Sequence, residues 1–159
     1  MEKVNQLAQE AVKAFTSADH LAYTTYNLIQ EPKLLMQIMQ KLYTSLVNGM
    51  NAYLYKDYEL KKITTIPITV EERIKLFEEK SARYNHIPMT IPLLIRELKN
   101  RVNYKKESIM DFTRKGKFIM AGEGFERLQV IDIVQIRSWI MQIRPFIEQI
   151  RSTLCLKQQ

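Results

Sequence analysis

Apolar residues return at helical spacing over most of the chain. From Val4 to about Ile29 they recur every three or four positions, which predicts a long amphipathic helix. Pro32 interrupts this pattern and suits the first turn of a second helix, where its missing N–H has no helical partner. The second helix, about Lys33 to Ile63, is apolar around most of its circumference and is expected to be central. Gly49 within it favours close approach of another helix.

Two shorter helices are expected after this helical hairpin. Thr69 and Glu72 have capping-box spacing and predict a helix that stops near Tyr84. A fourth helix begins around Ile91. Its pattern buries Ile91, Ile95, Leu98 and Val102 and exposes Arg96, Lys99, Asn103 and Lys106.

The pattern changes before the last helix. The β-prone runs 117–120 and 127–131 flank a glycine-containing turn at 121–124 and predict a small β-hairpin. Asp132 and Gln135 can then cap a helix in which Gln-Ile-Arg recurs every seven residues. Its seam consists of Ile133, Ile136, Ile140, Ile143, Ile147, Ile150 and Leu154, with Pro145 facing outward, where we expect a kink.

These elements predict an all-α fold: a bundle of about five helices, with a long N-terminal helical hairpin and a small β-hairpin before the C-terminal helix. Residues 1–159 are expected to form a single helical-bundle domain. Four Gly and five Pro in the chain favour long elements over a turn-rich β-fold. The single cysteine, Cys155, and a start without an apolar leader predict a cytoplasmic protein, and no apolar run is long enough to span a membrane.

Positive charge is concentrated in one part of the sequence. The chain has 24 Lys and Arg against 17 Asp and Glu, and residues 96–117 hold much of the excess. The basic residues there are Arg96, Lys99, Arg101, Lys105, Lys106, Arg114, Lys115 and Lys117. Tyr104 and Phe112 lie among them, a composition that suits phosphate contacts with occasional base stacking. The alternative is a solvated helix face that only aids solubility. Arg137, Arg144 and Arg151 either extend the basic surface or flank the helix seam.

Common catalytic and cofactor signatures are missing from the sequence. The two histidines, His20 and His86, lie far apart, and no spacing typical of zinc, di-iron or phosphate-loop sites occurs. We therefore expect no metal, no cofactor and no catalytic residue, and interpret His20 as a solvated or partly packed side chain.

One face of the first helix suggests self-association. Val12, Tyr23 and Tyr26 lie opposite its main apolar stripe, and tyrosine is favoured at interfaces. These residues are candidates for a homodimer interface. The competing interpretation is that other helices of the same chain cover both sides.

The order of elements, together with the segment Ala22-Tyr23-Thr24-Thr25-Tyr26-Asn27, resembles the HEPN superfamily of small prokaryotic and archaeal helical bundles. Catalytic members are ribonucleases with a longer Arg-to-His spacing than Arg83 and His86, which have only two residues between them. The resemblance therefore implies a non-catalytic member. The roles it suggests are binding of RNA, a nucleotide or a protein partner, and dimerisation through helices.

Three functional hypotheses follow. The first is a non-enzymatic, dimeric interaction protein whose basic segment binds RNA or another acidic partner. The second is an adaptor or antitoxin-like protein that docks another helix on its isoleucine seam or on the Tyr23 and Tyr26 face. The third is a divergent ribonuclease that uses His86 with Arg83.

Overall fold

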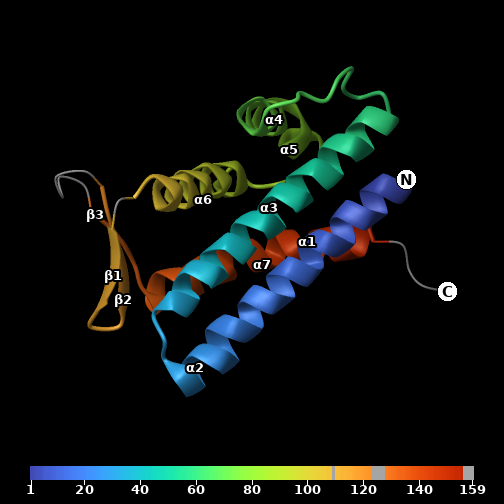
Figure 1. The fold of residues 1–159 in the computed structure, drawn as a ribbon. Coiled ribbons are helices and arrows are strands. Elements are labelled where there is room, and N and C mark those ends of the chain that lie inside the picture. Colours follow the sequence, from blue (N-terminus) through green and yellow to red (C-terminus); the bar gives the residue numbers. More distant parts are fainter. Residues whose placement is uncertain (109, 123–127, 156–159) are drawn as a thin grey trace.

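A computed structural model of the chain describes residues 1–108, 110–122 and 128–155. Helix α1 (Glu2–His20) continues through a π-helical turn, η1 (Leu21–Thr25), into α2 (Tyr26–Ile29). Helix α3 (Lys33–Glu59) runs back beside it, so the predicted helical hairpin is confirmed (Figure 1). The next segment consists of α4 (Val70–Leu76), a second π turn, η2 (Phe77–Ser81), and the short α5 (Ala82–Tyr84), and it is followed by α6 (Thr90–Glu107). Helix α7 (Ile133–Thr153) closes the fold.

A three-stranded sheet lies between α6 and α7 in the sequence. Strands β1 (Met110–Arg114), β2 (Lys117–Ala121) and β3 (Leu128–Ile131) are antiparallel in the order β1-β2-β3. The predicted hairpin is the β2–β3 pair, although most of its turn lies outside the described residues. Strand β1 was not predicted, because Asp111 and Arg114 are two of its five residues and it lies in the basic segment, which was interpreted as a turn. The fold is therefore mostly helical with a small sheet, and not strictly all-α.

The second helix ends earlier than its apolar pattern predicted. Its last helical residue is Glu59, and Lys61 has a left-handed backbone with φ of 60°. The N–H of Lys62 then donates to the carbonyl of Asp57, at 2.8 Å. Because a left-handed residue followed by such a bond closes a helix C-terminus, residues 60–63 form a turn. Ile63 is still buried, which explains why the sequence pattern continued to it.

The core is built around α3. Helix α7 packs closely against it at Gly49, where an added Cβ would lie 2.7 Å from Cδ1 of Ile150 and 2.8 Å from Cε1 of Phe146. The predicted close approach of a second helix is therefore confirmed. The α6 residues Ile91, Ile95, Leu98 and Val102 are also buried, as their spacing predicted.

The isoleucine seam of helix α7 is buried in the core of the same chain. The backbone N–H of Gln135 donates to Oδ1 of Asp132 at 2.8 Å, which confirms the predicted cap. The seam residues Ile136, Ile140, Ile143, Ile147, Ile150 and Leu154 are buried, and Ile133 is partly buried. The helix continues through the exposed Pro145. A partner helix could therefore reach this seam only by displacing helices of the same chain.

Within the described ranges, no helix combines the length and apolar character needed to cross a bilayer. The same part of the chain has no group of three or more His, Cys, Asp and Glu side chains arranged to hold a metal ion.

Candidate nucleic-acid interface

Four of the eight predicted cations on α6 and the sheet form ion pairs among the described residues, three of them with a residue outside α6. Arg96 pairs with Glu78 of η2, and Lys99 pairs with Glu71 of α4. The hydrogen bonds that these two cations donate hold the pKa values of Glu78 and Glu71 below their usual values. Lys105 pairs with Asp111 of β1. These pairs join α6 to the neighbouring elements, and they partly neutralise the positive charge of Arg96, Lys99 and Lys105. The sequence pattern had placed Arg96 and Lys99 among exposed residues, whereas both are half-buried.

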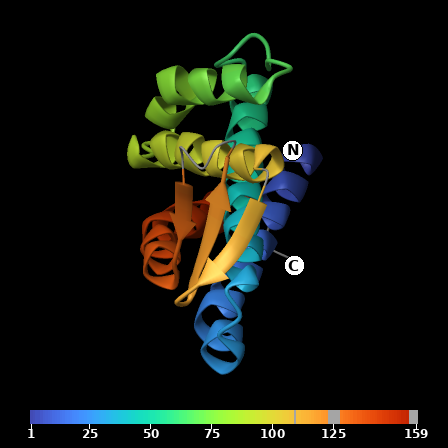
Figure 2. The ribbon, with the colours of Figure 1, turned by 60° about the vertical axis from the view of Figure 1, so that its left-hand side comes forward.

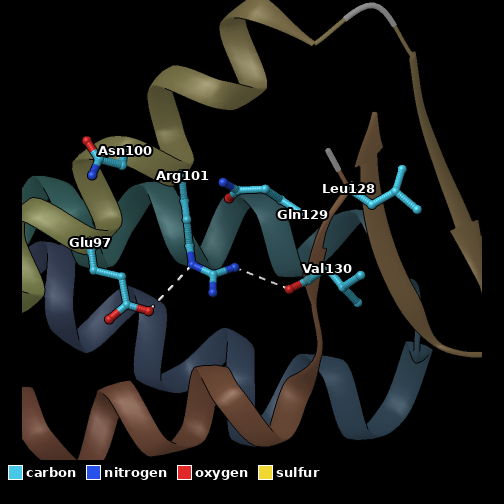
Figure 3. A pocket seen from close by; sticks show the side chains of 6 residues that line it. All are labelled: Glu97, Asn100, Arg101, Leu128, Gln129 and Val130. Atoms are coloured by element: carbon cyan, nitrogen blue, oxygen red, sulfur yellow. Dashed lines mark hydrogen bonds and ion pairs between the residues drawn. The ribbon is translucent and has the colours of Figure 1, made fainter. Parts of the chain in front are cut away.

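Arg101 crosses a groove between α6 and β3. It donates a hydrogen bond to the carbonyl oxygen of Val130 at 3.2 Å, and its Nε lies 3.6 Å from Oε1 of Glu97 (Figure 3). Its guanidinium carbon lies 5.3 Å from the centre of the Trp139 ring. The groove has a volume of about 390 Å³ and is lined by Glu97, Asn100, Arg101, Leu128, Gln129 and Val130. Arg101 therefore attaches α6 to the outer edge of β3.

The other four predicted cations are exposed. Lys106 is in the last turn of α6, and Arg114, Lys115 and Lys117 surround the turn between β1 and β2. Lys115 and Gly116 both have positive φ, 51° and 74°, as in the tight two-residue turns that suit β-hairpins. This turn places Arg114 directly opposite Lys117 in the register. Three positive side chains are therefore held close together on a defined backbone.

The same turn is attached to the helical bundle by a tyrosine. The hydroxyl of Tyr26 donates to the carbonyl oxygen of Gly116 at 3.4 Å, and Tyr26 is only 8% exposed. Val12 is partly buried against the core. Tyr23 is 40% exposed, and the guanidinium of Arg137 lies 5.1 Å from its ring centre. Tyr26 and Val12 are therefore covered largely by their own chain, which fits the competing interpretation for these two residues. Dimerisation itself stays a prediction.

The arginines of α7 contact the first helical segment. Arg137 donates to the carbonyl oxygen of Ala22 at 3.2 Å and to Oδ1 of Asn27 at 2.7 Å. Arg144 pairs with Asp19 at 2.9 Å. These contacts agree with the interpretation that the arginines flank a helix seam, although Arg151 is exposed.

The sheet has two chemically different faces. Phe118 and Met120 of β2 and Ile131 of β3 are buried against the helices. The residues that alternate with them point the other way, and Phe112, Ile119 and Val130 lie side by side across the three strands. Phe112 and Ile119 are half-buried and Val130 is exposed. Sequence reasoning selected Phe112 for its aromatic ring but missed Ile119 and Val130, because the continuous apolar run 118–120 does not show which of its residues face outward.

His86 occupies a left-handed position after α5. Its φ is 55°, and the N–H of Ile87 donates to the carbonyl of Ala82 at 2.8 Å, which closes the helix end. Both Arg83 and His86 are exposed. The position of His86 is accounted for by this helix end.

No family model, curated protein or solved structure matches the chain. The resemblance to the HEPN superfamily therefore stays a prediction.

Proposed function

We propose that the protein binds RNA through a basic surface that consists of Arg114, Lys115 and Lys117, and that it does so without catalysing a reaction. The observation that supports this most is the arrangement around Gly116: three exposed cations on one tight turn, held to α2 by Tyr26. Phosphate groups of a nucleic acid would be neutralised by these side chains, with release of bound counterions. Such contacts bind and orient the backbone and carry little sequence information.

The pairing of the other cations supports the choice of this surface. A basic stretch that serves only solubility would have its cations distributed over solvated faces, without a shared position. Here Arg96, Lys99 and Lys105 connect elements of the fold, while the exposed cations of the sheet are gathered at one end of it. An RNA and an acidic protein would both be attracted to this positive charge. We choose RNA because Phe112, Ile119 and Val130 lie beside the cations, and an aromatic ring can stack on a base.

The test is a fluorescence titration with a short labelled single-stranded RNA, on protein treated with nuclease and sized by light scattering. The variant Arg114→Gln/Lys115→Asn/Lys117→Gln removes three charges. Asn is chosen at residue 115 because it tolerates positive φ and an Asn-Gly pair favours this turn. We expect the affinity at low salt to fall at least tenfold, and the slope of log affinity against log salt to become shallower by about 2.

A matched control removes three exposed charges elsewhere. Lys13→Gln/Lys75→Gln/Lys80→Gln alters α1, α4 and η2 and leaves the sheet unchanged. Its affinity should stay within about twofold of the parent protein. Equal losses in the two variants would mean that only net charge matters, and the assigned surface would be wrong. If the parent protein fails to bind RNA even at low salt, RNA binding is overturned, and the protein-docking hypothesis becomes the one to test.

A further inference from the structure

The outer face of the sheet is open. All the helices lie on the other side of the sheet in Figure 1, and in Figure 2 the strands lie in front of α3 and α7 with α6 above them. Two apolar residues of β3 on this outer face, Leu128 and Val130, are 53% and 38% exposed. Within the described residues, no helix covers this face. Along β2, buried residues alternate with exposed or partly exposed residues only as far as Met120. The small side chain of Ala121, at the end of the strand, is buried.

The residues on this face form an apolar row, one aromatic ring and two branched side chains, next to a charged row of two cations. Phe112, Ile119 and Val130 are direct neighbours across β1, β2 and β3. Two residues further along, on the same face, Arg114 of β1 is paired with Lys117 of β2. Leu128 and Val130 are also among the residues that line the groove crossed by Arg101. In Figure 3 their side chains point away from Arg101, whereas Gln129 points toward it.

We propose that this face, and Phe112 in particular, is a stacking surface for unpaired bases, so that the RNA bound is single-stranded. This inference rests on the proposed function and specifies its ligand. A flat aromatic ring beside cations binds single strands because every base has a face that can stack, while the cations hold the phosphates. The bases of a duplex are stacked on each other and cannot reach the ring.

The charge argues against the other occupant of an open apolar face, a second copy of the chain. Two copies packed through this face would both contribute Arg114, Lys115 and Lys117 to one assembly, and like charges repel. A polyanion reverses that effect, because each phosphate placed near these side chains lowers the electrostatic energy. The apolar row and the charged row are therefore suited to the same ligand.

The experiment compares Phe112→Val with Phe112→Tyr. Valine removes the ring and keeps a residue that is favoured in strands, whereas tyrosine keeps the ring. Each variant is titrated with a single-stranded RNA of about ten nucleotides that carries 2-aminopurine, and with the duplex of the same sequence. We expect the single strand to bind the parent protein more tightly than the duplex, with a change in 2-aminopurine fluorescence. Phe112→Val should lower the single-strand affinity about tenfold and leave the salt slope unchanged, and Phe112→Tyr should keep both.

The outcomes separate this inference from the proposed function. If Phe112→Val binds like the parent, or the duplex binds as well as the single strand, while the three-charge variant still loses affinity, the stacking surface is wrong and RNA binding stands. If Phe112→Val only changes the oligomeric state, the face is an interface between copies and the inference is overturned. Thermal unfolding of both variants checks that the sheet is intact: a loss of binding by a Phe112→Val protein as stable as Phe112→Tyr supports stacking.

Discussion

Gly49 shows how one residue sets the distance between two helices. An added methyl group would overlap Ile150 and Phe146, the side chains that α7 places against α3. Alanine also has a higher helix propensity than glycine, so the two effects oppose each other. The contacts of less than 3 Å decide the sign of the change in stability, because Gly49 is buried between the two helices.

We expect Gly49→Ala to lower the free energy of unfolding by about 1–2 kcal/mol, the overpacking penalty less the gain in helix propensity. Denaturant unfolding measures it. Thr44→Ala, at an exposed position of the same helix, is the control and should raise stability slightly. An increase in stability for Gly49→Ala would mean that α7 can move away from α3 without penalty.

His86 has a backbone conformation that favours glycine. A non-glycine residue at φ of 55° is strained, and the conformation belongs to the turn after α5, in which the N–H of Ile87 donates to the carbonyl of Ala82. We expect His86→Gly to raise the free energy of unfolding by about 0.5–1 kcal/mol, and His86→Ala to give no such gain because it retains a Cβ. Thermal unfolding of the pair checks this.

The same two variants test the ribonuclease hypothesis. If His86 only occupies a helix end, any RNA cleavage by a purified preparation should be identical for the parent, His86→Gly and His86→Ala. Cleavage by the parent that both variants lose would instead give His86 a catalytic role with Arg83.

Among the elements, a polar cluster around the buried Asp57 joins α3 to η2, to α7 and to Asn85, the residue that follows α5. Asp57 is fully buried, and its Oδ2 accepts hydrogen bonds from the hydroxyl of Ser81 and from Nδ2 of Asn85, the latter at 2.9 Å. Lys56 donates to Oδ1 of Asn85 at 3.0 Å. Gln149 of α7 donates to the backbone carbonyl of Asn85 at 2.7 Å. Three elements and the start of the connection to α6 are therefore fixed by one group of polar side chains.

We expect Asp57→Ala to lower the free energy of unfolding by about 3 kcal/mol, because it leaves the buried donors of Ser81 and Asn85 without their acceptor. Ser81→Ala removes one donor and should lower it by only about 1 kcal/mol. Denaturant unfolding of both variants gives the comparison. Equal losses would indicate that Ser81 carries most of the effect and that the Asn85 bond adds little.

Sequence patterns predicted the elements whose signal is local. The seven-residue repeat of α7 and the capping residues Thr69 and Asp132 could be identified without knowing what the helices contact. Strand β1 could not, because Met110–Arg114 has little apolar character of its own and becomes a strand only by pairing with β2. The end of α3 was also missed, since Ile63 continues the buried pattern through a turn.

For the whole molecule, the sequence showed where positive charge is dense but not which charges are exposed. Arg96 and Lys99 are held by Glu78 and Glu71, acidic residues well before them in the sequence, and such pairs depend on how the helices pack. The candidate surface was therefore only partly predictable. The cations of this surface all lie in the basic segment of the sequence. Its apolar row, Phe112, Ile119 and Val130, comes from three strands and is recognisable only from their pairing.

The two faces of the sheet have different surroundings along the same strands. Phe118, Met120 and Ile131 pack against the helices, while Phe112, Ile119 and Val130, at the alternate positions, lie on the opposite face and are half-buried or exposed. Substitutions at the outward positions can therefore accumulate without disturbing the packing of the inward ones. A protein built in this way can exchange one ligand for another by changing alternate residues of a short segment, with its helical scaffold left as it is.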